Sequence, residues 1–125
     1  MKGKLRRKQH RDEQAEKERL EEELRIARQI QMSLLPGQEL ARMSGLRIAA
    51  LCLPAAEVGG DYYDLLPLGD TRMGVLVADV SGKGVGAALL MSNVKASLQA
   101  CAASSSEPAE IVAGVNRLLE RSVEP

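Results

Sequence analysis

The Gly69-Asp70 pair is the feature that most constrains the fold of this chain. It lies between two stretches with strand character, Asp61 to Leu68 and Arg72 to Val80, and so predicts a β-hairpin. Facing residues of an antiparallel hairpin keep a constant sum of residue numbers, which a turn centred here sets at about 140. This register places Asp61 directly opposite Asp79. Two carboxylates therefore face each other at the open end of the hairpin.

The same register assigns a core face to the hairpin. The side that carries the two acids continues in apolar pairs: Tyr63 with Val77, Leu65 with Val75, and Pro67 with Met73. The opposite side, from Tyr62 to Ala78, mixes polar and apolar residues. We therefore expect the acid-bearing face to be buried and the opposite face to be less buried.

Two facing carboxylates with Cβ atoms about 4.5–5.5 Å apart need compensation for their charge. One acid could remain protonated in a shared-proton dyad, or cations could lie between the two. We favour cations, because hard divalent ions bind carboxylates, backbone carbonyls and water, and paired ions occur in phosphoryl-transfer sites. Gly59-Gly60, Gly82 and Gly84 leave backbone room for water and an anion. The competing interpretation is that each Asp beside a Gly only ends a strand.

Further elements are predicted on both sides of the hairpin. Leu46 to Leu53 is apolar at successive positions, as in a buried strand, and Pro54 closes it. The stretch from Ala87 to Ala102 has helical composition and periodicity. After a serine-rich break, Ser106 is a candidate N-cap for another helix with Pro108 in its first turn.

A long charged helix is predicted from Arg11 to Leu35, and Pro36-Gly37 ends it. Five residues recur along it at coiled-coil spacing and form a weak seam that is partly polar because it includes Gln31: Leu20, Leu24, Ala27, Gln31 and Leu34. It can be a surface helix supported by charge pairs, or a dimerising linker that carries a signal from an upstream sensor. Residues 1–10 are expected to form a solvated basic tail.

Composition excludes several classes of function. The chain has no Phe or Trp and two Tyr, which argues against nucleic-acid binding by base stacking. No apolar run is long enough to cross a membrane. Cys52 and Cys101 form no metal or disulfide pattern, so we expect a reduced, cytoplasmic protein. The run from Gly82 to Gly86 departs from a Walker A motif, and Ser81 has no histidine nearby to activate it.

Four motifs in order carry a family resemblance: IQMSLLP, PAAEVGGDYYD, VADVSGKGVGAALLMS and PAEIVAGVNRLL. The chain resembles the PPM (phosphatase 2C-like) family of metal-dependent serine/threonine phosphatases. It is most similar to the bacterial branch of the sporulation stage II protein E phosphatase and the phosphatases that control stress sigma factors. The resemblance extends from about Gln29 to Leu119.

The resemblance implies an α/β/β/α sandwich with two Mg²⁺ or Mn²⁺ ions and a metal-activated water that attacks a phosphoserine or phosphothreonine. It implies that Asp61 and Asp79 hold the metals and that Val80 offers its backbone carbonyl. Lys83 is either a phosphate contact or a solvated loop lysine, and Tyr62, Tyr63 and Asp64 belong to the scaffold. The implied partners are a phosphorylated protein, such as an anti-sigma-factor antagonist, and an upstream sensor or a second copy joined through residues 11–35.

Two departures from the family pattern qualify this resemblance. Gly86 stands where the family commonly has Pro. The family's later strands and aspartates are absent, so we expect an α+β chain, an incomplete sandwich preceded by a long helix, with little activity alone. The expected organisation is a basic tail at 1–10, a helical linker at 11–35 and a truncated phosphatase domain at 36–125. The alternative is a non-catalytic regulatory or dimerisation module that acts through the helix.

Overall fold

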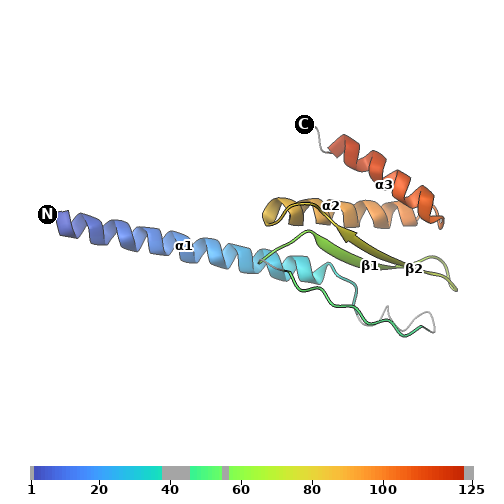
Figure 1. Ribbon diagram of the computed structural model, residues 1–125, viewed down its shortest axis with the longest axis horizontal. Coiled ribbons are helices and arrows are strands. Elements are labelled where there is room, and N and C mark those ends of the chain that lie inside the picture. Colours follow the sequence, from blue (N-terminus) through green and yellow to red (C-terminus); the bar gives the residue numbers. More distant parts are fainter. Residues whose placement is uncertain (1, 38–45, 55–56, 123–125) are drawn as a thin grey trace.

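The protein folds as an α+β chain in a computed structural model that describes residues 2–37, 46–54 and 57–122. The order of elements is α1 (Lys2–Ser33), β1 (Asp61–Pro67), β2 (Met73–Asp79), α2 (Val85–Ala102) and α3 (Pro108–Ser122). The predicted α+β class with a long N-terminal helix is confirmed. Figure 1 shows α1 extending away from a body made of the hairpin and the two later helices.

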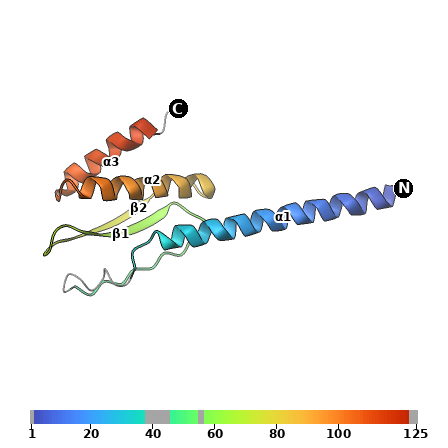
Figure 2. The same ribbon diagram turned by 180° about the vertical axis from the view of Figure 1, so that it is seen from behind.

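The body is layered. Helix α2 covers one face of the hairpin, and α3 packs on α2 on the side away from the strands, as the views in Figures 1 and 2 agree. The core between these layers is small and largely aliphatic, and its buried members are Tyr62, Met91, Leu98, Ile111 and Val115. This core fixes α2 on β1, so it also fixes the loop that leads from β2 into α2.

The hairpin has the predicted register. The strands pair antiparallel with Asp61 opposite Asp79 and Leu65 opposite Val75. Each strand is one residue shorter at the turn than expected, and Gly69 adopts a positive φ of 83° there, which favours glycine. The turn therefore sets which residues face each other, as the sequence indicates.

The predicted core face of the hairpin is wrong. Tyr62, Asp64 and Leu66 are 2%, 2% and 7% exposed, whereas Val75 and Val77 on the other face are 64% and 83% exposed. The mixed face is buried because its charge is neutralised from α2, where the Lys95 ammonium lies 3.2 Å from Asp64. A charged group can be buried when it is paired with an opposite charge. The number of apolar residues on each face of the hairpin therefore did not predict which face is buried.

The strand expected from Leu46 to Leu53 is not found, and this segment has no regular secondary structure. Leu46, Leu51 and Leu53 are 58%, 78% and 74% exposed. A strand needs a hydrogen-bonded neighbour, and among the described residues only β1 and β2 pair. Apolar composition alone therefore does not make this segment a strand.

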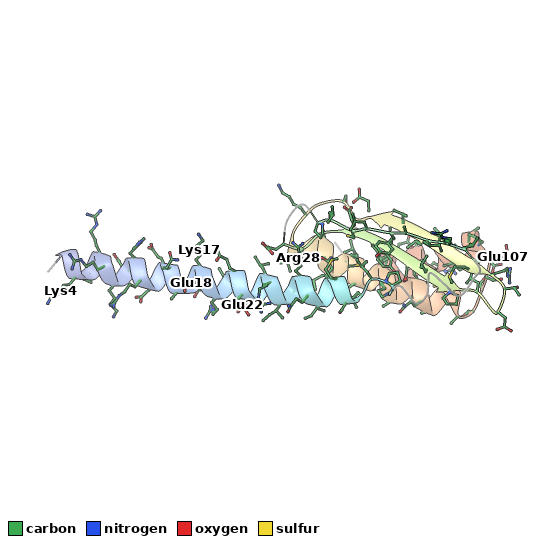
Figure 3. The ribbon with its side chains drawn as sticks, turned by 90° about the horizontal axis from the view of Figure 1, so that it is seen from below. Lys4, Lys17, Glu18, Glu22, Arg28 and Glu107 are labelled. Carbon is green, nitrogen blue, oxygen red and sulfur yellow. The ribbon has the colours of Figure 1, made fainter. Side chains whose placement is uncertain are left out.

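Helix α1 is longer than predicted, because the expected basic tail is helical from Lys2. Its end at Ser33 agrees with the stop signal at Pro36-Gly37. Figure 3 shows Lys4, Lys17, Glu18 and Glu22 on the part that projects into solvent. Exposed ion pairs such as Lys17–Glu21 at 3.7 Å line this part, and each adds little stability. No helix of the described chain has a stretch that is apolar and long enough to span a membrane.

Helices α2 and α3 lie close to their predicted positions, but the N-terminal contact of α3 differs. The Ser105 hydroxyl accepts from the Glu107 N–H at 3.1 Å and donates to Glu110, so Ser105 supports the first turn. Ser106, the predicted cap, instead accepts a hydrogen bond from Arg72 at 2.9 Å. This contact ties the turn end of the hairpin to the α2–α3 connection.

Candidate metal centre

The two candidate ligands face each other at the end of the hairpin that is opposite the turn. The Val80 N–H donates to the Gly60 carbonyl oxygen at 3.2 Å, and the ladder therefore extends one pair beyond the strands. Hydrogen-bonded pairs alternate with non-hydrogen-bonded ones, so Asp61 and Asp79 form a non-hydrogen-bonded pair. Cα atoms in such pairs are about 4.5 Å apart, which brings the side chains closer than in the neighbouring pairs.

Both acids are exposed and lie on the hairpin face that α2 leaves open. They share a cavity of about 360 Å³ whose other polar side chains are Gln31, Cys52 and Lys83. Two carboxylates that line one open cavity can accept a cation from solvent without first breaking a contact of the fold.

Gly60 and Val80 make a close backbone contact beside the acids. A Cβ built on Gly60 would lie 2.5 Å from the Val80 carbonyl oxygen, a distance that real Cβ atoms do not reach. Only glycine therefore lets the strands approach here. Gly60 also leaves this carbonyl uncovered by a side chain, which fits a ligand role for Val80.

The donor set suits a hard divalent ion but is incomplete. Asp61, Asp79 and the Val80 carbonyl are all oxygen donors, which Mg²⁺ and Mn²⁺ prefer. Within the described ranges, no group of three or more acidic, His or Cys residues could hold a metal ion. An octahedral Mg²⁺ ion commonly keeps several waters, so these donors fit one partly hydrated ion.

Cys52 is a neighbour of the site, although the sequence shows no metal or disulfide pattern around it. It is half-buried and free, and it lines the cavity with Asp61. Burial and the negative charge of Asp61 raise the pKa of the Cys52 thiol, and Arg28 on α1 opposes that shift. Figure 3 shows Arg28 where α1 reaches the body. No local motif indicates this neighbour, because residues 52 and 61 belong to different segments.

Gln31 connects α1 to the glycine pair before Asp61. Its side chain is 7% exposed, its Nε2 donates to the Gly59 carbonyl oxygen, and its Oε1 accepts from the Gly59 N–H at 3.1 Å. The sequence placed Gln31 in a coiled-coil seam, but the structure turns this position inward. The polar residue within an apolar stripe was the one signal of such a role.

Asp64 belongs to the scaffold and does not line this cavity. It accepts hydrogen bonds from the Tyr62 hydroxyl and from the Leu65 N–H at 2.9 Å, and it pairs with Lys95. Burial and the hydrogen bond to Asp64 raise the pKa of the Tyr62 hydroxyl. The Lys95 ammonium also lies 5.6 Å from the centre of the Tyr62 ring.

Comparisons with known proteins agree with the motifs of this chain. The family model described as Stage II sporulation protein E (SpoIIE) matches residues 69–125. The chain is 31% identical over 105 residues to "Phosphoserine phosphatase RsbU" of Bacillus subtilis, which covers 84% of this chain and 31% of that protein. It is 44% identical over 69 residues to "Protein IcfG" of Synechocystis, which covers 55% of this chain and 11% of that protein.

A solved structure matches the fold. The "SiaA-PP2C domain of Pseudomonas aeruginosa" superposes with a TM-score of 0.77 at 26% identity, over 87% of this chain and 45% of that chain. This chain thus spans less than half the length of each of these three proteins. Together the matches confirm the resemblance of this chain to the N-terminal portion of a PPM-type phosphatase domain.

Proposed function

We propose that this portion of a PPM-type phosphatase domain serves the hydrolysis of phosphoserine or phosphothreonine on a partner protein in bacterial signalling. The observation that carries the proposal is the pairing of Asp61 with Asp79 at one open cavity. The similarity to a protein named as a phosphoserine phosphatase supports the substrate class. Regulation of sigma factors, with an anti-sigma-factor antagonist as substrate, is the biological setting that the family suggests.

In this proposal, Asp61, Asp79 and the Val80 carbonyl hold Mg²⁺ or Mn²⁺, with two ions in a complete domain. Such ions lower the pKa of bound water and neutralise phosphate charge when they are present. The role of this chain in the site would be to hold two carboxylates at a fixed separation. The non-hydrogen-bonded pairing of Asp61 with Asp79 is suited to this role. Gly60 keeps the backbone beside them open.

Metal titration of conservative variants tests the proposal. We expect Asp61→Asn and Asp79→Asn each to weaken Mn²⁺ binding at least tenfold, because each removes one of two charged ligands. Asp70→Asn is the matched control, since Asp70 is exposed in the hairpin turn and does not line the cavity. Mn²⁺ binding that is equal in all three variants and the unmodified chain would refute the metal centre.

Turnover by these 125 residues alone is expected to be very low. The described residues bring only two carboxylates to the cavity. A second ion would then lack charged ligands, and phosphate neutralisation would be incomplete. The assay is release of phosphate from a phosphoserine peptide with Mn²⁺. Sustained turnover that Asp61→Asn abolishes would contradict this expectation while supporting the metal centre.

Helix α1 is proposed to act as a signal-carrying linker, with an upstream sensor or a second copy as its partner. The supporting observation is the paired hydrogen bonding of Gln31 to Gly59, two residues before Asp61. Displacement of α1 would break both contacts and release the backbone that positions this carboxylate. A purely regulatory module would use α1 in the same way but would not need Asp61 and Asp79.

The linker proposal predicts a specific effect on metal affinity. Gln31→Ala should weaken Mn²⁺ binding about tenfold, as loss of groups that orient a ligand commonly does. Gln14→Ala is the control, because Gln14 is an exposed residue of α1 that bonds only Glu18 among the described residues. Equal affinities for the two variants would show that α1 does not position the site.

A further inference from the structure

Lys83 lies on the short loop between Asp79 and the start of α2 at Val85. Two glycines flank it, and both have positive φ, 100° at Gly82 and 77° at Gly84. A Cβ on either glycine would meet nothing within 4 Å, so their backbone conformation rather than crowding favours glycine. These two turns bring Lys83 back to the wall of the cavity lined by the acids.

The cavity wall carries two negative side chains and one positive side chain among the described residues. Lys83 is the one cationic side chain among the described residues that line it, and two carboxylates share the lining. Within the described part of the chain, Lys83 makes no ion pair and no side-chain hydrogen bond. By contrast, Lys95 on α2 is committed to Asp64. The ammonium of Lys83 is therefore available to a group that enters the cavity.

We propose that Lys83 binds the phosphate group of the substrate, in the cavity that Asp61 and Asp79 line. The inference rests on the proposed function, because divalent ions on the two carboxylates would reverse the sign of the local charge. An ammonium beside bound dications favours a dianionic phosphate and disfavours the dications themselves. Lys83 thus raises the affinity for phosphate and lowers the affinity for the metal ions.

This opposition separates a binding role from a structural one. Lys83→Met should weaken binding of inorganic phosphate to the Mg²⁺-loaded chain about five- to tenfold, the loss expected for one partly solvated charge. It should leave Mg²⁺ affinity unchanged or raise it, because a repelling charge is removed. A lysine that only stabilises the loop would weaken both on removal. Lys83→Arg keeps the charge and should keep phosphate binding.

The experiment is calorimetric titration of the 125-residue chain, first with Mg²⁺ and then with inorganic phosphate. The matched control is Lys4→Met, since Lys4 is an exposed lysine on the projecting part of α1 (Figure 3). A second measurement is the rate at which Lys83 is methylated by formaldehyde and a reducing agent, followed by peptide mass spectrometry. Phosphate should slow this methylation in the presence of Mg²⁺, and should not slow that of Lys4.

The outcomes are distinguishable. If Mg²⁺ binds and depends on Asp61, but Lys83→Met binds phosphate as tightly as the unmodified chain, the proposal for Lys83 fails and the metal centre stands. If Lys83→Met weakens Mg²⁺ and phosphate equally, the lysine is structural and the proposal also fails. If no Asp61-dependent Mg²⁺ binding is found, the proposed function and the inference fail together.

Discussion

The buried ion pair between Asp64 and Lys95 gives the clearest stability prediction. The two charged atoms are 3.2 Å apart, and the side chains are 3% and 13% exposed. Removing one member of such a pair costs about 3–5 kcal/mol, because the remaining charge stays in a poorly solvated place. Asp64 would keep two hydrogen bonds, from the Tyr62 hydroxyl and the Leu65 N–H. We therefore expect about 3 kcal/mol for Lys95→Met, which preserves most of the apolar stem.

Urea unfolding followed by tyrosine fluorescence measures this loss, since Tyr62 is buried in the core and the chain has no Trp. The double variant Asp64→Asn with Lys95→Met should lose less than the sum of the single variants, because it leaves no unpaired charge. Lys17→Met is the control: its ion pair is 69% and 64% exposed and should contribute less than about 0.5 kcal/mol. A loss for Lys95→Met as small as that of the control, or strictly additive losses, would refute the reasoning.

Three further outcomes are expected. Gly60→Ala should destabilise the chain by about 1–3 kcal/mol and weaken Mn²⁺ binding, because its methyl group would overlap a backbone carbonyl that cannot easily move; unchanged unfolding would contradict this. Gly114→Ala would place its methyl group 2.7 Å from the Cys101 sulfur, so it should be destabilising alone and less so combined with Cys101→Ala. Alkylation of Cys52 at pH 8 should be slower than that of a free thiol, because the raised pKa of Cys52 leaves less thiolate. Mg²⁺ or Asp61→Asn should accelerate the alkylation, because each neutralises or removes the negative charge of Asp61 that disfavours the thiolate. An alkylation rate that Mg²⁺ does not change would count against an ion at this carboxylate.

The register of the hairpin could be predicted because it depends on local chemistry. A Gly-Asp turn between two strand-like runs fixes which residues face each other, and the pairing of Asp61 with Asp79 follows without knowledge of any other element. The two later helices were predictable for the same reason, since their periodicity and end signals lie within their own sequences.

The buried face of the hairpin could not be predicted, because it depends on a partner that is distant in the sequence. Asp64 is buried only because Lys95, 31 residues later, supplies its counter-charge. The same holds for Gln31, whose partner Gly59 is 28 residues away, and for Cys52 beside Asp61. Pattern within a segment tells which residues share a face, but the choice between faces is made by contacts between segments.

The odd spacing of Asp61 and Asp64 explains how one short strand serves both the scaffold and the site. Side chains alternate between the faces of a strand, so two acids three residues apart point to opposite sides. One then faces α2 and anchors it through Lys95, while the other faces the open cavity opposite Asp79. Acids two or four residues apart would lie on the same side of the strand. Both would then face α2, or both would face the cavity. Because Asp64, which anchors α2, and Asp61, the proposed ligand, belong to one strand, a change that loosens α2 should also disturb the carboxylate pair.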